Sequence, residues 1–280
     1  MVQVGRTGNM NDHEGMPARP LRVLLVNDHL GYAQGVIHGV SRYFMALAGQ
    51  FDPRQVEIHL CILRPHHPAA EVLEAAGIRP IFLGLSKWDP RALSRLVGLL
   101  DDLEIDLLHL SGLKGCLLGR IAARLRRRPA IIHFHDTTPI PPIIRFFQRW
   151  LSPWTARALA ISEPVRQFGI EQFKLPADLV EMLPYGLVIE EFATPSPEVG
   201  KQVRRELSID PDAPVIGVMS RLVFEKGHET LLRAMVQIRR SHPRIVLLVA
   251  GDGERRLYLE DLARDLELGE SVRFAGFRQD

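Results

Sequence analysis

The chain alternates short apolar runs with helix-like stretches, and this alternation limits the possible folds more than any other feature. The first run, Leu21–Val26, leads through a glycine-containing loop into a segment whose apolar residues recur at helical spacing from Val36. Six further strand-like runs follow: Val56–Leu63, Arg79–Leu83, Ile105–Leu110, Ala130–Phe134, Ala158–Ile161 and Val180–Leu183. The helix-like stretches between most of them are Pro90–Leu103, Leu113–Leu125, Ile143–Leu151 and Glu163–Phe173. Apolar strands alternating with helices predict an α/β fold with a parallel sheet covered on both faces.

The pattern stops at Val188–Val199, where the run Thr-Pro-Ser-Pro marks a linker, and then restarts. Three strands and two helices follow: Val215–Met219, Glu229–Arg239, Ile245–Ala250, Arg255–Leu266 and Ser271–Phe277. A length of 280 residues also favours two domains. We predict a disordered tail over residues 1–19, an N-terminal Rossmann-like domain over 20–187 and a second over 188–280. Three strands are half of a doubly wound domain, so the second domain is expected to be incomplete. Either a partner covers its open faces or the sequence is a truncated reading frame.

Composition excludes some classes of function. The formal net charge of +2 gives no support for a nucleic-acid-binding protein. Cys61 and Cys116 lie in apolar contexts and are read as core residues of a protein in a reducing compartment. No apolar stretch is long enough to span a bilayer, and the first twenty residues have no signal-peptide core, so a cytoplasmic protein is expected. An arginine cluster at 124–128 is interpreted as a solvated helix end, with membrane or phosphate contact as the alternative.

Ligands of parallel α/β sheets bind beyond the carboxyl ends of the strands, so residues just after each strand are the candidates for a site. The first candidate is the loop Gly31–Gly35 with Gly39 beyond it, where backbone N–H groups and a helix N-terminus can hold an anion. It lacks the spacing of dinucleotide-binding and P-loop motifs. Glycines that serve only a tight turn are the alternative interpretation.

The second candidate is a histidine pair in the run Ile-Ile-His-Phe-His-Asp at 131–136. Strand alternation places His133 and His135 on one face, with His135 at the carboxyl end of the strand. The pattern alone is compatible with a cleft histidine, with a metal site and with a purely structural histidine pair. The metal site is disfavoured because no convincing set of further ligands follows, and no metal is predicted.

The third candidate is the loop Ser220–His228, which follows the strand Val215–Met219. Arg221 and Lys226 are two cations on one strand-to-helix loop that ends at a helix N-terminus. Arginine grips phosphate oxygens in a bidentate way and lysine adds a point charge, which suits a diphosphate. Solvated cations paired with Glu225 or Glu229 are the alternative.

Several segments together resemble the family 4 glycosyltransferases of the GT-B fold. The run RLVFEKGHETLLRA from Arg221 is similar to the family's donor-phosphate signature, and the segment from Val249 to Phe277 is similar to the one that follows it. HGVSRYFMALA from His38 is similar to the glycine-rich loop and first helix, and AIIHFHD to the strand with the cleft histidine. ALAIS, ending at Ser162, and LPYG, ending at Gly186, continue in register, so the resemblance covers Leu21 to Phe277.

The chain departs from the family pattern at three places. His38 occupies the position of the first of two usual glycines. Tyr185 and Val188 stand where an asparagine and an aspartate are common. The family's later pair of glutamates, which contact the transferred sugar and the ribose, would lie after Asp280.

The resemblance implies two Rossmann-like domains facing a cleft and transfer of a sugar from a nucleoside-diphosphate donor with retention of configuration. The implied acceptor is a glycan, a lipid-linked molecule or a small molecule. No metal or cofactor beyond the nucleotide-sugar co-substrate is implied. Arg221 and Lys226 would hold the diphosphate, and His135 would position the sugar.

The remaining implied site residues are glycines and one serine. The loop of Gly35 and Gly39 would close over the substrates, and the other cleft positions are Ser162, Gly186, Gly251 and Gly253. Two alternatives remain: a sugar-nucleotide isomerase on the same fold, and a non-catalytic remnant with little or no transferase activity.

One segment suggests a further partner. Apolar residues in Ile140–Trp154 interleave with Arg145 and Arg149, a composition typical of segments that lie in a bilayer interface. Peripheral contact with the inner face of a membrane is therefore expected, with core packing of these residues as the alternative.

Overall fold

The computed structural model describes residues 19–31, 37–86, 89–187, 189 and 196–278. The chain divides into two compact units, an N-terminal unit, Met1–Val188, and a C-terminal unit, Ile189–Asp280. The predicted tail over residues 1–19 lies outside the described residues except for Arg19. The Arg19 guanidinium donates to both carboxylate oxygens of Asp106 at 2.7 Å.

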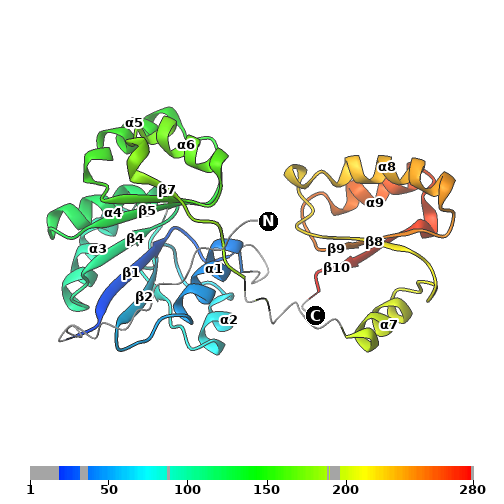
Figure 1. Ribbon diagram of the computed structural model, residues 1–280, viewed down its shortest axis with the longest axis horizontal. Helices are drawn as coiled ribbons and strands as arrows, with labels where there is room; N and C mark the ends of the chain where they lie inside the picture. The colour runs from blue at the N-terminus through cyan, green and yellow to red at the C-terminus, as the bar shows by residue number, and fades with distance from the viewer. Residues whose placement is uncertain (1–18, 32–36, 87–88, 188, 190–195, 279–280) are drawn as a thin grey trace, which may run out of the picture. The chain divides into compact units, whose positions relative to one another are not determined.

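A seven-stranded parallel sheet forms the centre of the N-terminal unit (Figure 1). Its order is β3-β2-β1-β4-β5-β6-β7. The strands are β1 (Leu21–Asn27), β2 (Val56–Ile62), β3 (Ile81–Phe82), β4 (Leu107–Leu110), β5 (Ala130–Phe134), β6 (Arg157–Ala160) and β7 (Val180–Met182). The chain runs outward from β1 in one direction to β3 and then returns to continue from β4. The carboxyl ends of β1 and β4 therefore flank a topological switch point, where ligands of such sheets bind.

Helices cover both faces of this sheet (Figure 1). They are α1 (Gly39–Ala48), α2 (Ala70–Ala75), α3 (Arg91–Asp102), α4 (Leu113–Leu125), α5 (Pro142–Trp150) and α6 (Glu163–Phe173). Strand β1 shows why the predicted runs are continuously apolar, since Val23 and Leu25 belong to one buried cluster and Leu24 and Val26 to the other. The apolar pattern does not predict α2, whose six residues span fewer than two helical turns.

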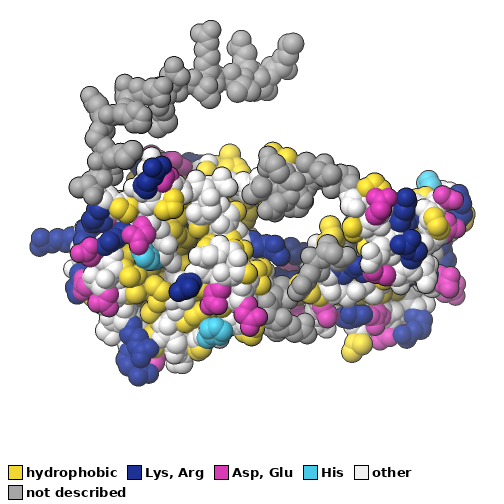
Figure 2. Space-filling model, turned by 90° about the horizontal axis from the view of Figure 1, so that it is seen from below, with side chains coloured by type: hydrophobic (Ala, Val, Ile, Leu, Met, Phe, Trp, Pro, Cys, Tyr) yellow, Lys and Arg dark blue, Asp and Glu magenta, His cyan; other side chains and the backbone are white. Residues whose placement is uncertain are grey.

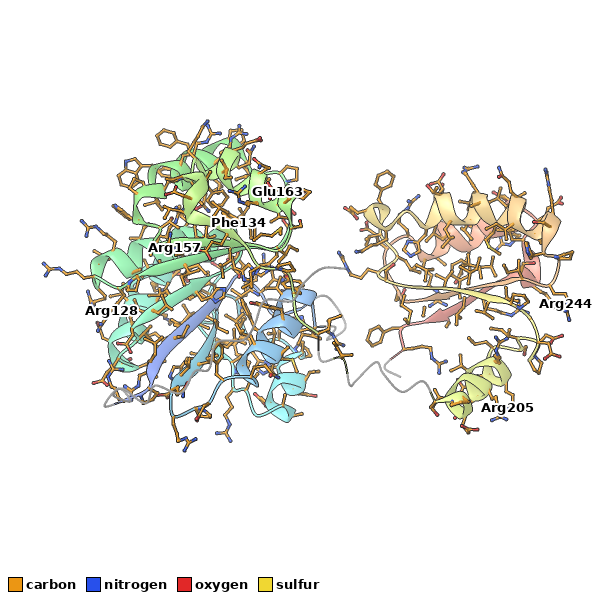
Figure 3. All side chains as sticks on the ribbon, in the orientation of Figure 1. Arg128, Phe134, Arg157, Glu163, Arg205 and Arg244 are labelled. Atoms are coloured by element: carbon orange, nitrogen blue, oxygen red, sulfur yellow. The ribbon has the colours of Figure 1, made fainter. Side chains whose placement is uncertain are left out.

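The end of β5 is fixed against α6 by aromatic packing. Phe134, labelled in Figure 3, is the last residue of β5 and is buried. Its ring centroid lies 4.7 Å from that of Phe173, and a Cβ atom at Gly169 would come within 2.6 Å of the Phe134 ring. This contact sets the position of the next residue, His135.

The C-terminal unit contains a three-stranded parallel sheet of order β10-β9-β8. Its elements are α7 (Pro197–Glu206), β8 (Val215–Met219), α8 (His228–Ser241), β9 (Val246–Ala250), α9 (Arg256–Asp265) and β10 (Val272–Gly276). Helices α8 and α9 pack on one face over a core that includes Leu232, Leu247 and Leu259 (Figure 1). On β8 the Met219 side chain is 86% exposed.

The predicted linker, Val188–Val199, extends too far at its C-terminal end. Helix α7 begins at Pro197, and the Ser196 hydroxyl accepts a hydrogen bond from the Val199 N–H at 3.4 Å. Serine as N-cap with proline at the first helical position is a helix start rather than a linker. Of the remainder of this segment, residues 188 and 190–195 lie outside the described residues.

Three predictions from composition concern the cysteines, membrane-spanning segments and the balance of surface charge. Cys61 and Cys116 are free and buried, and burial raises the pKa of both thiols to about 12. Among the described residues, no helix has the length and apolar content needed to cross a bilayer. The face in Figure 2 shows Lys and Arg interspersed with Asp and Glu on each unit, without a large region of one sign.

Candidate functional site

His135 follows β5 directly and lies at the carboxyl edge of the N-terminal sheet. Its Nε2 atom is 2.8 Å from the Ser111 hydroxyl, which comes from the end of β4, and its Nδ1 atom is 2.5 Å from the Tyr185 hydroxyl. A neutral imidazole has one donor and one acceptor nitrogen, and hydroxyl groups can serve either, so both contacts can be satisfied together. Two neighbouring segments therefore fix the orientation of the ring.

The imidazole of His135 is held neutral. Burial, with His109 and His38 nearby, lowers its pKa to about 3. At neutral pH the ring therefore acts as an uncharged hydrogen-bonding group that offers one donor and one acceptor. It suits contacts with neutral hydroxyl groups better than a contact with an anion.

Two tyrosines form a stacked wall beside His135. The ring centroids of Tyr43, from α1, and Tyr185 lie 4.7 Å apart with an interplanar angle of 24°. Sequence reasoning gave Tyr185 only as a departure from the family pattern, and it did not single out Tyr43 or Ser111. The signal for Ser111 was its position one residue after a strand, but the pairing of two tyrosines 142 residues apart depends on the tertiary fold.

His133 lies behind His135 and belongs to a buried layer. The two ring centroids lie 4.2 Å apart, and His133 Nδ1 is 3.2 Å from His109 Nε2. Burial lowers the pKa of His133 to about 2 and that of His109 to about 4. Among the described residues no group of three His, Cys, Asp or Glu side chains could hold a metal ion. His133 is thus part of the support for His135.

The glycine-rich loop is only partly described, since Gly35 lies outside the described residues. Gly39 is the first residue of α1, and a Cβ atom there would meet nothing within 4 Å. The preceding His38 caps the helix: its Nδ1 accepts from the Ser41 N–H at 3.2 Å, and its Nε2–H donates to the His29 carbonyl at 2.8 Å. The histidine that replaces the family's glycine therefore fixes the start of α1.

Asp28, which sequence reasoning missed, occupies the N-terminus of α4. Its carboxylate accepts from the N–H groups of Lys114 at 3.1 Å and Gly115 at 2.6 Å. Gly112, at φ +76°, allows this approach, because a Cβ atom there would lie 2.6 Å from Asp28 Cγ. Burial raises the pKa of Asp28 despite these bonds. The α4 N-terminus is filled by the protein's own carboxylate, so it does not offer these N–H groups to a ligand.

Two predicted cleft residues lie in loops of the same unit. Ser162 follows β6 and occupies the N-cap position of α6, without a side-chain capping bond. Gly186 follows Tyr185, and a Cβ atom there would meet nothing within 4 Å. No hydrogen bond of the described residues joins either of them to His135.

In the C-terminal unit, Arg221 and Lys226 lie on the loop between β8 and α8, and both are exposed. Lys226 ends a 3-10 turn, Phe224–Lys226, and Gly227, at φ +69°, is the N-cap residue of α8. Within the described residues Lys226 forms no ion pair. The loop is anchored at its ends by the Ser220 hydroxyl, which lies 3.0 Å from His228 Nε2.

Glu229, one acidic residue considered as a partner for these cations, is engaged elsewhere. Its carboxylate accepts from Arg233 at 3.0 Å, from the Tyr258 hydroxyl at 3.0 Å and from Arg255 at 3.2 Å. The hydrogen bond from Arg233 is the main cause of a lowered Glu229 pKa. The hydrogen-bond partners of Glu229 thus come from α8, from α9 and from Arg255 just before α9, rather than from Lys226.

Gly251 and Gly253 allow the loop after β9 to pack on the loop after β8. A Cβ atom at Gly251 would lie 2.0 Å from the Ser220 carbonyl oxygen, and one at Gly253 would lie 2.5 Å from that of Leu222. The Leu222 N–H donates to the Asp252 carbonyl at 2.9 Å, which holds the two loops together. These glycines therefore shape the loop that carries Arg221.

Two family models of known proteins match this chain. A family model described as Glycosyltransferase Family 4 matches residues 37–191, and one described as Glycosyl transferases group 1 matches residues 200–280. The chain is 28% identical over 249 residues to a GDP-mannose-dependent alpha-(1-6)-phosphatidylinositol monomannoside mannosyltransferase of Mycolicibacterium smegmatis, covering 84% of this chain and 63% of that protein. It is 26% identical over 263 residues to an uncharacterized glycosyltransferase of Methanocaldococcus jannaschii, covering 88% and 67% of the two chains.

The fold agrees with solved structures. The structure of Anabaena HepE in complex with UDP and glucose superimposes with a TM-score of 0.77 at 20% identity, covering 92% of this chain and 70% of that one. The chain thus spans 63% to 70% of the length of these three proteins. Because the first family model matches more than half of its residues, this chain belongs to glycosyltransferase family 4.

Proposed function

We propose that this protein transfers a sugar from a nucleoside-diphosphate donor to an acceptor, with retention of configuration and without an obligatory metal ion. The observation that carries the proposal is the loop between β8 and α8, on which Arg221 and Lys226 are both exposed. This loop lies within the segment that matches the group 1 glycosyl transferase model.

The chemistry of this loop suits a diphosphate leaving group. Arginine can donate two parallel hydrogen bonds to phosphate oxygens, lysine adds a compact charge, and the N-terminus of α8 contributes partial positive charge. Negative charge grows on the diphosphate as the bond to the sugar breaks. Cations placed beforehand stabilise that charge without reorganisation. Arg221 and Lys226 would therefore both bind the donor and promote departure of its nucleotide.

His135 would contribute as an uncharged hydrogen-bonding group. Its depressed pKa keeps it neutral, so it suits a sugar hydroxyl. Ser111 and Tyr185 hold the ring in one orientation, and a ligand hydroxyl would replace one of these two partners. If the acceptor attacks the sugar on the face from which the diphosphate departs, the configuration is retained. The leaving phosphate then takes the acceptor proton, so no side-chain nucleophile is required.

The names of similar proteins support a proposal for the acceptor class. The Mycolicibacterium relative carries phosphatidylinositol monomannoside in its name, and HepE was solved with UDP and glucose. We propose that the acceptor of this protein is a glycan or a lipid-linked molecule. Peripheral membrane contact through Ile140–Trp154 is part of the same proposal.

Replacing Arg221 or Lys226 with alanine should weaken binding of a nucleoside diphosphate while leaving the fold intact. A charge-assisted hydrogen bond contributes roughly 1.5–3 kcal/mol, so each variant should bind roughly 10- to 100-fold more weakly. Both side chains are exposed, so no cavity or buried unpaired group results. Calorimetric titration of R221A and K226A with UDP, GDP and ADP measures the effect.

Lys201 provides the matched control. It is an exposed lysine on α7 of the same unit, paired with Glu198 at 3.6 Å, and K201A should bind as the unmutated chain does. Unchanged affinity in both R221A and K226A would contradict the proposal. Absence of binding of all three nucleotides to the unmutated chain would contradict it as well.

A further inference from the structure

Helix α5 presents its apolar side chains to the outside and buries a polar one. Ile143, Phe146, Phe147 and Trp150 are 61%, 62%, 41% and 63% exposed, whereas Gln148 is the one side chain of α5 that is fully buried. The four exposed residues follow the spacing i, i+3, i+4 and i+7, which places them on one face of the helix. We call these four side chains the α5 face. Core packing, the alternative for this segment, does not explain why these four side chains are exposed.

A polar network holds α5 in this orientation. Gln148 Oε1 accepts from the fully buried Arg120 of α4, whose guanidinium also donates to the Gln148 carbonyl at 3.2 Å and to the Thr155 hydroxyl at 3.3 Å. Gln148 Nε2 donates to the Leu113 carbonyl at 2.7 Å. Rotating α5 to bury its aromatic residues would take both Gln148 acceptors away from buried Arg120, which is strongly unfavourable.

The helix lies in the outer layer of the N-terminal unit. It packs on α4 and α6, and it lies at the edge of the unit away from the sheet (Figure 1). On the α6 side, Arg149 donates to the carbonyls of Gln172 at 3.1 Å and Glu171 at 3.1 Å. The α5 face is therefore fixed and presented outward. Four exposed apolar side chains on one helix face are typical of an interaction surface.

The surrounding charge indicates the chemistry of the partner. Residues 107–162 contain nine Lys and Arg residues and one acidic residue, Asp136, although the whole chain has a net charge of only +2. Three of these cations form ion pairs, Arg126 with Asp101 at 2.6 Å, Arg157 with Glu181 at 3.7 Å and Arg128 with Asp106 at 3.8 Å, and Arg120 is buried. The α5 helix itself carries Arg145 and Arg149 and no acid.

From this combination we infer that the α5 face inserts into the interface of an anionic lipid bilayer. Aromatic and aliphatic side chains on one helix face enter the boundary between headgroups and acyl chains, and flanking arginines contact lipid phosphates. A typical protein–protein interface contains about ten direct hydrogen bonds, whereas the α5 face offers only the Trp150 indole N–H. The inference deepens the membrane contact in the proposed function, but its test reads lipid binding alone and is independent of donor binding.

Flotation of the whole chain with phosphatidylcholine vesicles that contain phosphatidylglycerol tests the inference. The unmutated chain should float at low salt, and less at high salt or with pure phosphatidylcholine. The double variant F146S/W150S should bind at least tenfold more weakly. The matched control is F51S/V72S, which removes two exposed apolar side chains elsewhere in the N-terminal unit and should bind normally.

A second measurement needs no substitution. Brominated phosphatidylcholine in the same anionic vesicles should quench the tryptophan fluorescence of the unmutated chain, since Trp150 would lie at acyl-chain depth. Absence of flotation at low salt, or equal binding by F146S/W150S and the unmutated chain, would overturn the inference. So would self-association of the chain that F146S/W150S abolishes without any vesicle binding, because the α5 face would then join two copies.

Discussion

Lowering the pH from 7 to 5 should reduce the free energy of unfolding of the N-terminal unit by about 6 kcal/mol. Burial lowers the pKa of His109 to about 4, of His135 to about 3 and of His133 to about 2, from an ordinary value of 6.5. These histidines bind protons in the unfolded chain below pH 6.5 but stay neutral in the folded unit until the pH falls further. Stability is therefore complete above pH 6.5 and is lost as the pH falls toward the folded-state values. At pH 5 each of these three histidines lowers the free energy of unfolding by about 2 kcal/mol.

This loss is comparable to the whole stability of a typical domain, which is roughly 5–15 kcal/mol. Asp28 acts in the opposite direction, because burial raises its pKa. All three tryptophans of the sequence precede residue 155, so their fluorescence reports on the N-terminal unit. Urea unfolding followed by this fluorescence at pH 7, 6 and 5 measures the effect.

A single substitution should change the size of the acid effect. His109→Gln retains a donor toward His133 and removes one titrating group, so the loss between pH 7 and 5 should shrink by about 2 kcal/mol. His242→Gln, at an exposed position of the C-terminal unit, should leave the loss unchanged. An identical pH dependence in H109Q and the unmutated chain would show that the histidine layer is not the cause.

Gly251→Ala should destabilise the C-terminal unit by roughly 4 kcal/mol or more. The new Cβ atom would lie 2.0 Å from the Ser220 carbonyl oxygen, and alanine would have to adopt a φ of +141°. Backbone strain of this kind costs of the order of 1–3 kcal/mol. Separation of the loops would also weaken the hydrogen bonds from Gly251 N–H to the Gly276 carbonyl, at 2.7 Å, and from Ser220 N–H to the Ala250 carbonyl, at 3.1 Å.

Hydrogen exchange of the β9 amides, followed by mass spectrometry, measures this loss directly. Protection of Val246–Ala250 should fall sharply in G251A. Gly200→Ala is the matched control, because a Cβ atom there meets nothing within 4 Å inside α7, and alanine should stabilise the helix by about 0.5–1 kcal/mol. Unchanged β9 protection in G251A would mean that the loops after β8 and β9 are not held in the observed contact.

Local patterns in the sequence determined the framework of the fold. Strands β5 and β8 and helices α4 and α6 have the predicted bounds, because each combines a continuous apolar or helix-periodic run with a clear end signal. The parallel arrangement followed from the alternation of strands and helices. The candidate positions after strands, including His135, Arg221 and Lys226, followed from the rule that parallel strands end at one edge.

Only the tertiary structure decided how several of these elements are used. Apolar periodicity identified a helix at Ile143–Leu151 but could not show which face is outside. That orientation depends on Arg120, 28 residues earlier in the chain, because burying its guanidinium requires Gln148 as an acceptor. Similarly, Asp28 meets the N-terminus of α4 and Tyr185 meets His135 across long stretches of sequence. Such contacts satisfy buried polar groups, and a local pattern of apolar residues contains no information about which distant residue supplies the partner.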